Sequence, residues 1–258
     1  MGQSGSRLDR VVEYVIHNGF IWTCLHIIFI LLRYSDIRID QLKRFIEHKY
    51  TLPGTYYTAH NYRTWERYVW KKLGEEWTPS ATWKESLFRK VIKPYASGVS
   101  CILEIGCGAG RWSELLLNMS DHIILVDVSP KAIDQCKSRF STYSHIEYHV
   151  NNGSTLDFIE EETVDFIWSF DVFTIVGPNG IESYIREFSR VLKIGGTGIV
   201  QHSGQNGYQY GWSSFDSDIF LTTLSACGLF VVDQIVEWGN GYKLEGIHKS
   251  TVMTVFTK

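Results

Sequence analysis

The chain of 258 residues is long enough for one large domain, or for one domain with an appended segment. Its composition, with 44% hydrophobic and 21% charged residues, is that of a globular protein with a substantial buried core. With 25 basic against 28 acidic residues, it lacks the positive surplus that broad contact with phosphates requires, so no nucleic-acid partner is expected.

Five cysteines are spread along the chain, without a Cys-x-x-Cys pair and without a Cys/His cluster of metal-ligand spacing. An odd, scattered set is typical of reduced thiols, so we expect a cytoplasmic protein with no bound metal. The five are Cys24, Cys101, Cys107, Cys136 and Cys227.

Residues 1–54 form the first predicted unit, which is helical and apolar. Within it, the run 20–32 (FIWTCLHIIFILL) is almost entirely apolar, but a membrane-spanning helix needs about 20 such residues. Extension toward the N-terminus brings in Glu13, His17 and Asn18. We therefore expect a buried or interfacial helix, with peripheral membrane contact through residues 20–32 as the second interpretation and a membrane span as the third.

Residues 55–97 form the second predicted unit, a helical cap that is dense in aromatic and charged side chains. A helix is expected from about residue 80 to residue 93. Ser80 is a suitable N-cap for it, and Pro94 is expected to end it.

From residue 98 to residue 258, short apolar runs alternate with amphipathic stretches. Strand, helix, strand at this spacing predicts βαβ units and a parallel sheet, and the last two apolar runs predict an antiparallel closing pair. The expected fold class is therefore α/β: a Rossmann-like, doubly wound, mostly parallel seven-stranded sheet with an antiparallel last strand, preceded by an N-terminal helical extension. Strands are expected at 100–105, 122–126, 146–150, 164–169, 196–201, 230–238 and 251–257, and helices near 110–119, 130–140, 180–193 and 215–226.

A glycine-rich turn, LEIGCGAGR, follows the first of these strands. Gly106, Gly108 and Gly110 can adopt positive φ and let a ligand approach the backbone, while the helix N-terminus presents unpaired N–H groups. Dinucleotide-binding folds use G-x-G-x-x-G/A, but the third small position is occupied here by Arg111. Glu104 would repel a diphosphate and suits a cationic ligand such as S-adenosylmethionine, which carries an ammonium and a sulfonium. A nicotinamide-dependent oxidoreductase is the rival class of enzyme.

A second carboxylate, Asp127, ends the next strand, 17 residues after Gly110. In a doubly wound sheet this strand end flanks the glycine turn at the switch point, where Asp127 can accept both hydroxyls of a ribose. That role is the same for NAD and for S-adenosylmethionine. The structural alternative is a cap for the helix that opens at Ser129.

Five stretches follow one another in this part of the chain: LEIGCGAGRW, VDVSPKAI, EYHVNNG, VDFIWSFDVF and KIGGTGIVQH. In this order they resemble the motifs of the class I S-adenosylmethionine-dependent methyltransferases, over residues 99–258. The preceding aromatic stretch, NYRTWERYVWKKLGEEWTPSATWKESL, is similar to bacterial small-molecule and glycan methyltransferases. The resemblance implies an enzyme that takes its methyl group from S-adenosylmethionine.

The resemblance also implies a donor site at the carboxyl ends of the first strands. The three glycines of the turn would line the methionine portion, Glu104 would orient it, and Asp127 would hold the ribose. Asn152 stands where the family often has an aspartate that contacts the adenine amino group. The backbone from Ser169 to Asp171 would face the ammonium. The implied cofactor residues are Glu104, Gly106, Gly108, Gly110, Asp127, Val128, Asn152, Gly153 and Ser169.

A general base is needed only if the acceptor must lose a proton. Asp171 and His202, at the ends of the fourth and fifth strands, are the candidates by position; a loop carboxylate and a structural histidine are the alternatives. The aromatic side chains Tyr62, Trp65 and Trp77 are candidates for the acceptor pocket, and packing of the cap onto the sheet is their alternative.

The acceptor class follows from what stands after the fourth strand. No NPPY-like tetrapeptide is present there; the sequence is SFDV, which argues against amino-group methylation of bases or glutamine. We therefore predict a small-molecule or sugar-type acceptor. A non-catalytic, membrane-tethered protein that retains the fold is a further alternative, motivated by the apolar run 20–32 and by Asn152.

Overall fold

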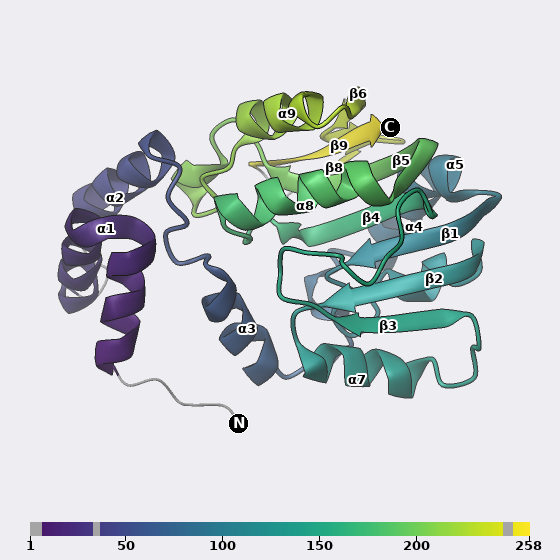
Figure 1. The fold of residues 1–258 in the computed structure, drawn as a ribbon, viewed down its shortest axis with the longest axis horizontal. Helices are drawn as coiled ribbons and strands as arrows, with labels where there is room; N and C mark the ends of the chain where they lie inside the picture. The colour runs from purple at the N-terminus through teal and green to yellow at the C-terminus, as the bar shows by residue number, and fades with distance from the viewer. Residues whose placement is uncertain (1–6, 33–36, 245–249) are drawn as a thin grey trace.

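The computed structural model describes residues 7–32, 37–244 and 250–258. It consists of an α/β domain and of N-terminal helices that lie beyond one end of the strands (Figure 1). The carboxyl ends of β1 and β2 face these helices. The N-terminal elements are α1 (Arg7–Leu31), α2 (Ile37–Lys49), α3 (Thr58–Arg67), a 3-10 turn (Glu75–Trp77), α4 (Ala81–Leu87), a π-helical turn (Phe88–Ile92) and α5 (Lys93–Ala96).

The sheet has seven strands in the order β3-β2-β1-β4-β5-β9-β6. Strands β1 to β5 pair in parallel, whereas β9 is antiparallel to both of its neighbours. The predicted fold class, with an antiparallel last strand, is thus confirmed. The strands are β1 (Val99–Ile105), β2 (Ser120–Asp127), β3 (Ile146–Val150), β4 (Val164–Phe173), β5 (Leu192–Ser203), β6 (Phe230–Ile235) and β9 (Thr251–Thr257), with a separate pair β7 (Glu237–Trp238) and β8 (Tyr242–Lys243).

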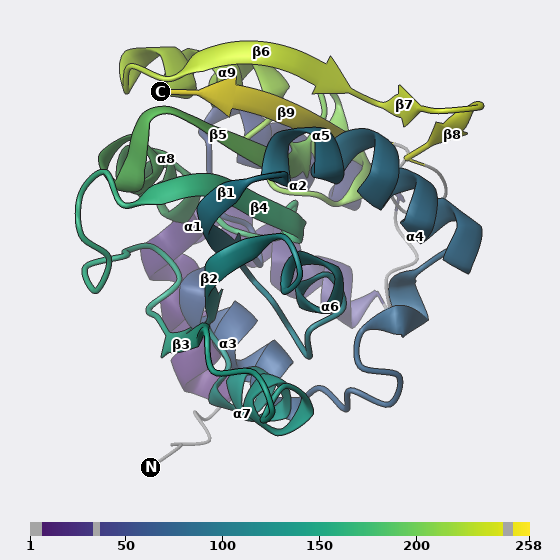
Figure 2. The ribbon, with the colours of Figure 1, turned by 90° about the vertical axis from the view of Figure 1, so that its right-hand side faces the viewer.

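Helices cover both faces of the sheet, as Figure 2 shows for α4 to α6 on one side and α8 on the other. Alternation along β1 explains this, because successive side chains of a strand point to opposite faces. Ile102 packs in the core on the α4 side, whereas Leu103 and Ile105 pack with α8 and α9. The remaining helices are α6 (Ser113–Leu116), α7 (Pro130–Arg139), α8 (Pro178–Val191), the 3-10 helix η3 (Gly207–Tyr210) and α9 (Ser217–Ala226).

Two helix predictions were wrong in their extent. Pro94 does not end the helix that begins after Ser80, because a π-helical turn precedes it. There the Lys93 amide donates to the Phe88 carbonyl, five residues back, and this wider turn accommodates the proline, which has no amide hydrogen. The helix expected near 110–119 is reduced to α6, because residues before Ser113 remain in the glycine-rich turn.

The N-terminal helices are fastened to the sheet domain by specific polar contacts. Helix α1 bends at Gly19 (φ 79°), and the Asn18 side chain beside the bend exchanges two hydrogen bonds of 2.7 and 2.8 Å with the Gly54 backbone. Helix α2 holds the segment after β5, where His48 Nε2 lies 2.7 Å from the Asp216 carboxylate. The N-terminal helices and the segment that follows β5 therefore form one wall.

Candidate active site

The glycine-rich turn lies between β1 and α6 and has positive φ at all three glycines. The angles are 72° at Gly106, 55° at Gly108 and 89° at Gly110. Gly106 and Gly108 line a cavity at the carboxyl ends of β1, β2 and β4, whereas Gly110 packs away from it, where an added Cβ would lie 2.5 Å from the Phe140 ring. An added Cβ at Gly108 would lie 2.8 Å from the Trp70 indole. An added Cβ at Gly106 would meet Val172 still more closely, so both glycines bring the backbone against the cavity lining.

Asp127 ends β2 beside this turn and also lines the cavity. One carboxylate oxygen accepts from the Gly108 amide at 3.0 Å, and the other accepts from the Ser129 amide at 2.9 Å. Helix α7 is capped by the Ser129 side chain, so Asp127 is not its N-cap. Burial raises the pKa of Asp127 to about 6, although both amides oppose this. Each oxygen keeps acceptor capacity for a ligand hydroxyl.

Glu104 lies beneath the turn and does not line the cavity. It is 2% exposed, and its Oε2 accepts from the Ser113 hydroxyl at 2.6 Å. Burial raises its pKa to about 8; the bond from Ser113 and the nearby charge of Arg111 act in the opposite direction. Glu104 is therefore buried behind the turn and is not part of the cavity lining.

The end of β4 brings a second pair of charges to the cavity. Arg111 Nη2 donates to Asp171 Oδ2 at 2.6 Å, and both residues line the cavity. Asp171 has a positive φ of 63° and its amide donates to the Gln201 side chain at 2.7 Å. Arg111 is buried, and within the described residues its Nη1 has no hydrogen-bond partner. Ser169 lies two residues before Asp171 in β4. Its hydroxyl donates to the Ile105 carbonyl and is not part of the cavity lining.

The cavity, of about 260 Å³, is walled mainly by aromatic side chains. Trp65, Trp70 and Trp77 come from the cap, with ring centroids 5.7–5.9 Å apart, and Trp112 and Trp212 come from the sheet domain. The indole N–H groups of Trp70 and Trp212 are buried without a partner among the described residues. The cavity thus offers unsatisfied donors within an apolar enclosure.

The structure brings together Gly106, Gly108, Asp127, Val128, Gly153, Asp171, Trp65 and Trp77, all of which were expected from the sequence. It does not bring Glu104, Gly110, Asn152, Ser169, Tyr62 or His202 to the cavity lining. Tyr62 is 42% exposed. Asn152 is exposed too, and its Oδ1 accepts from the amides of Ser154 and Thr155 in a local turn.

His202 is buried on the opposite face of the sheet. Its ring stacks on Phe220 of α9 at 3.8 Å. Nδ1 lies 2.9 Å from the Ser203 carbonyl and Nε2 lies 2.7 Å from the Thr254 hydroxyl, so Nδ1 carries the hydrogen and both nitrogens are occupied. Burial lowers the pKa of His202 to about 3. The expectation that His202 acts as a base at the cavity is therefore corrected: it is a neutral, structural histidine.

Several lining residues were not anticipated from the sequence. Arg111 follows the glycine-rich turn but was not among the expected site residues, and Trp70 lies in the aromatic stretch between the predicted Trp65 and Trp77. Trp212 lies nine residues beyond the end of β5, where a Gly-Trp pair is the local signal. Further lining residues are Thr58 and Asn61 of α3, Thr174 and Ile175 after β4, and Tyr184 of α8. Among the described residues, no group of three His, Cys, Asp or Glu side chains is placed to hold a metal.

Comparison with known proteins gives matches along the sequence. Residues 102–196 match the family model of a methyltransferase domain. The tRNA N(3)-methylcytidine methyltransferase of Schizosaccharomyces pombe is 28% identical over 187 residues, which are 67% of this chain and 60% of that protein. Nodulation protein S of Bradyrhizobium diazoefficiens is 39% identical over 46 residues, which are 18% of this chain and 22% of that protein. The chain thus spans three fifths or less of these curated relatives.

Two solved structures share the fold. The N-methyltransferase NodS from Bradyrhizobium japonicum, in complex with S-adenosyl-L-homocysteine, has a TM-score of 0.62 at 20% identity and covers 77% of this chain and 98% of its own. The TehB-like S-adenosylmethionine-dependent methyltransferase from Corynebacterium glutamicum has a TM-score of 0.56 at 23% identity and covers 78% and 98%. At these identities the likeness establishes the architecture.

Proposed function

Because the chain belongs to the class I S-adenosylmethionine-dependent methyltransferases, we propose that it transfers the methyl group of S-adenosylmethionine to a small-molecule or sugar-type acceptor. We assign the transfer to residues 98–258 and closure of the donor site to the cap of residues 55–97. Residues 1–54 support the wall on the acceptor side. The observation that carries the proposal is one cavity with a carboxylate, Asp127, on one side of the glycine turn and the Arg111–Asp171 pair on the other.

These charges fit the two ends of the donor. The ribose offers two hydroxyls, which Asp127 would accept with the lone pairs left beside the Gly108 and Ser129 amides. The methionine end offers a carboxylate and an ammonium. The unpartnered Nη1 of Arg111 would donate to the carboxylate, and Asp171 would face the ammonium. A zwitterion on an ion pair keeps every charge in the cavity matched.

The buried Glu104 would complement the positive donor from beneath the turn. A carboxyl with a raised pKa ionises more readily when a cation approaches, so donor binding would draw a proton from Glu104. Neither a dinucleotide nor any other diphosphate ligand would gain from this arrangement. The sheet order, with the antiparallel β9 between β5 and β6, also differs from that of dinucleotide-binding folds.

When bound, S-adenosylmethionine supplies a methyl carbon already activated by the sulfonium. The chain then has to orient the acceptor and exclude water, and such positioning contributes about 7–11 kcal/mol to lowering a barrier. The indoles of Trp65, Trp70 and Trp77 would exclude water on the cap side. Glu66 in the same cap accepts from the Ser129 hydroxyl at 3.0 Å, which fastens the cap over the donor end. We assign Asp171 a binding role, because Arg111 and the Gln201 side chain already hold its carboxylate and its amide.

The acceptor end of the cavity favours a small, uncharged molecule. The charged side chains in the lining are Asp127, Arg111 and Asp171, and all are assigned to the donor. What remains toward Trp212 is aromatic or neutral, and a flat sugar or ring face packs well on indole. The N–H of Trp212 would donate to an acceptor oxygen.

A nucleic-acid acceptor is the second candidate, because one relative is by name a tRNA methyltransferase. The net charge of −3 opposes it, since RNA binding draws on a surplus of lysine and arginine. Parallel assays with radiolabelled S-adenosylmethionine, on a panel of sugars and small metabolites and on total tRNA, separate the two. Label in the small-molecule fraction supports our proposal, and label only in tRNA contradicts it.

Donor binding is tested independently of the acceptor. We expect S-adenosylhomocysteine to quench the tryptophan fluorescence saturably, because five indoles line the cavity, and we expect NAD to leave it unchanged. Quenching by NAD alone would contradict the proposal. Donor binding without turnover on either panel would instead favour a non-catalytic protein that retained the fold.

We propose a cytoplasmic location with a membrane-facing N-terminal segment. All five cysteines are unpaired in the structure, as expected in a reducing compartment. The described residues include one helix, α1, that is long and apolar enough to cross a membrane by length and composition. The bend at Gly19 and the contacts of Asn18 favour surface contact over a span.

A further inference from the structure

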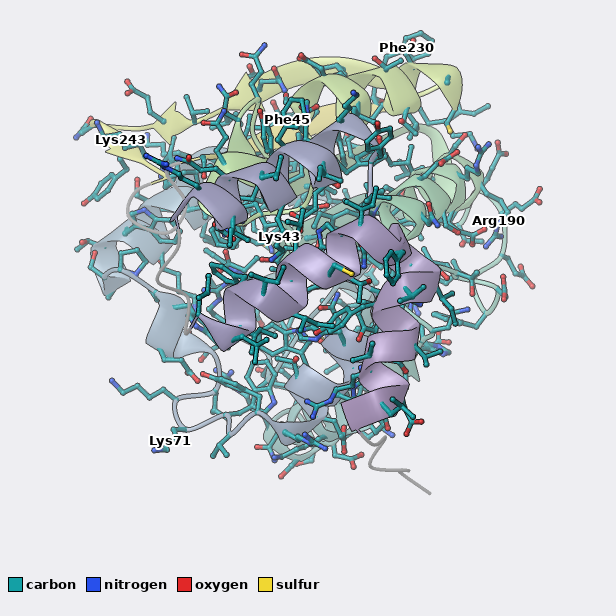
Figure 3. The ribbon with its side chains drawn as sticks, turned by 90° about the vertical axis from the view of Figure 1, so that its left-hand side faces the viewer. Lys43, Phe45, Lys71, Arg190, Phe230 and Lys243 are labelled. Atoms are coloured by element: carbon teal, nitrogen blue, oxygen red, sulfur yellow. The ribbon has the colours of Figure 1, made fainter. Side chains whose placement is uncertain are left out.

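The outward face of α1 and α2 is apolar, and Figure 3 looks onto this side of the molecule, with Phe45 labelled on α2. Five large side chains of α1 are 70–73% exposed, which is unusual for so many in one element. They are Leu8, Ile16, Phe20, Ile21 and Leu31. Helix α2 adds Leu42 and Phe45, both exposed. We call this surface the α1–α2 face.

The exposed residues follow the helical repeat on both sides of the bend. Before it, Leu8, Val12 and Ile16 recur every four residues, and after it Ile21, Ile28 and Leu31 continue the stripe. The inward side of α1 is apolar as well, with Trp22 fully buried. After the bend, where α1 runs FIWTCLHIIFIL, apolar side chains lie on nearly all sides of the helix. Such a helix belongs in a protein core or in contact with lipid, and here one side has no protein cover among the described residues.

Helix α1 could cross a membrane only if it lost the polar contacts that hold it on the rest of the protein. Asn18 bonds both polar groups of the Gly54 backbone, and Trp22 Nε1 donates to Glu47 Oε1 at 2.6 Å. Tyr57 donates to Glu13 Oε2 at 3.0 Å. These contacts hold one side of α1 on the protein, so the opposite side is available only to a surface that α1 lies along.

Charge identifies the kind of surface. The first 50 residues carry seven basic and five acidic residues, whereas the remaining chain carries 18 and 23. The exposed cation Lys49 borders the α1–α2 face, where its ammonium lies 5.2 Å from the Tyr50 ring centre and 6.0 Å from that of Phe45. Positive charge beside apolar and aromatic side chains suits the headgroup region of an anionic bilayer. A symmetric pair of chains would instead bring the same positive charges together.

We propose that the α1–α2 face docks in the plane of a membrane that contains anionic phospholipid. Its apolar stripe would enter the boundary of headgroups and acyl chains, with Lys49 at the phosphates. Helix α2 holds the segment after β5 through His48 and Asp216, and Trp212 in that segment lines the cavity. Docking therefore fixes the acceptor wall near the membrane surface.

Sedimentation with vesicles of phosphatidylcholine, with and without phosphatidylglycerol, tests this on the full chain. We expect binding to the anionic vesicles that weakens with salt, and little binding to phosphatidylcholine alone. The triple variant Phe20→Gln, Ile21→Gln, Leu31→Gln removes three large apolar side chains from the face, so its partition coefficient should fall at least about 100-fold. The matched control Ile194→Gln, Phe230→Gln, Val232→Gln alters three exposed apolar residues elsewhere and should bind as the unchanged chain does.

Two results would overturn the docking proposal. One is a triple variant that partitions like the unchanged chain. The other is a chain that ignores vesicles but forms a dimer which the triple variant abolishes, because the face is then an interface between copies. The variant Lys49→Gln keeps the apolar face and should weaken only the preference for anionic lipid. Vesicle binding needs neither donor nor acceptor, so its failure is distinct from failure of the proposed methyl transfer.

Discussion

Arg111 and Asp171 lie 60 positions apart in the chain, and the structure joins them at 2.6 Å in the lining of one cavity. The Arg111 guanidinium also lies over the rings of Trp112 and Phe170, at 5.3 and 5.6 Å from their centres. Aromatic walls and an acidic partner fix its orientation, and among the described residues Nη1 has no hydrogen-bond partner.

Replacement of Arg111 with Met should weaken binding of S-adenosylhomocysteine about 10- to 100-fold, because a charge-assisted hydrogen bond to the ligand carboxylate is lost. Binding of 5′-methylthioadenosine, which lacks the amino-acid end, should change by less than about threefold. Calorimetric titration measures both. Arg186→Met, which removes an exposed arginine of α8 paired with Glu182, is the control. Equal losses for the two ligands would place Arg111 outside the methionine end.

The variant Asp127→Asn should show the opposite pattern. Both ligands contain the ribose, so both affinities should fall by a similar factor, about 10- to 100-fold. The asparagine side chain has only one oxygen, so it can no longer accept from the backbone N–H groups of both Gly108 and Ser129 on separate oxygens, and the turn is loosened. Asp134→Asn, at an exposed position of α7, controls for the loss of one negative charge. Unchanged titration curves would refute the ribose role.

Stability of the ligand-free protein should fall as pH rises through about 8. The folded-state pKa of Glu104, about 8, lies above its ordinary value of 4.5, so the folded chain keeps a proton that the unfolded chain has lost. The resulting stabilisation is fully present below pH 4.5 and disappears as pH rises through the folded value. Asp127 contributes with the same sign between 3.8 and about 6.

Thermal unfolding of the Glu104→Gln variant isolates the first of these groups. Glutamine cannot titrate, so the decline of Tm from about pH 6 to pH 9 should be smaller than in the unchanged chain, by on the order of 5 °C. Parallel curves for the two proteins would show that Glu104 is ionised in the folded state.

Substitutions at Gly108 and Gly98 separate backbone strain from cavity space. Both glycines have positive φ, 55° and 76°, so alanine should lower the free energy of unfolding at each by about 1–2 kcal/mol. A Cβ at Gly98 meets no atom within 4 Å, whereas one at Gly108 would lie 2.8 Å from the Trp70 indole, which would have to shift within the cavity. Only Gly108→Ala should weaken S-adenosylhomocysteine binding, measured by fluorescence quenching. A similar loss in Gly98→Ala would attribute the effect to strain alone.

The sheet and the donor end were predictable because they depend on local patterns. The apolar runs predicted six strands within a few residues of their observed positions and overextended the seventh, which ends at Ile235 rather than at Trp238. Gly106, Gly108 and Asp127 reach the cavity because a strand end, a tight turn and a neighbouring strand end coincide at one edge of a parallel sheet.

The predicted site residues that do not line the cavity are held by other hydrogen bonds or face the other side of the sheet, which the sequence pattern does not reveal. Asn152 was aligned with an adenine contact, but its side chain satisfies nearby amides first, which short polar side chains do readily in turns. His202 stands near the correct strand end on the wrong face; Val200, two positions earlier, already faces the α8–α9 core, and alternation assigns His202 to the same side. Arg111, Asp171 and Trp212 reach the cavity through contacts between segments that are distant in the sequence, and local spacing does not encode such contacts.

The N-terminal helices hold the segment after β5 in place, and this arrangement would link the fold of the N-terminal segment to acceptor recognition. The Ser214 hydroxyl donates to the Leu52 carbonyl at 2.6 Å, and His48 meets Asp216 close by. A protein shortened to begin after residue 54 would keep the sheet and the glycine turn, and with them the affinity for the nucleoside. It would lose the contacts that hold the segment carrying Trp212. Acceptor recognition would therefore weaken, whereas the methyl donor would still bind. Under the proposed function, the range of acceptors would therefore depend partly on a segment that lies outside the sheet domain.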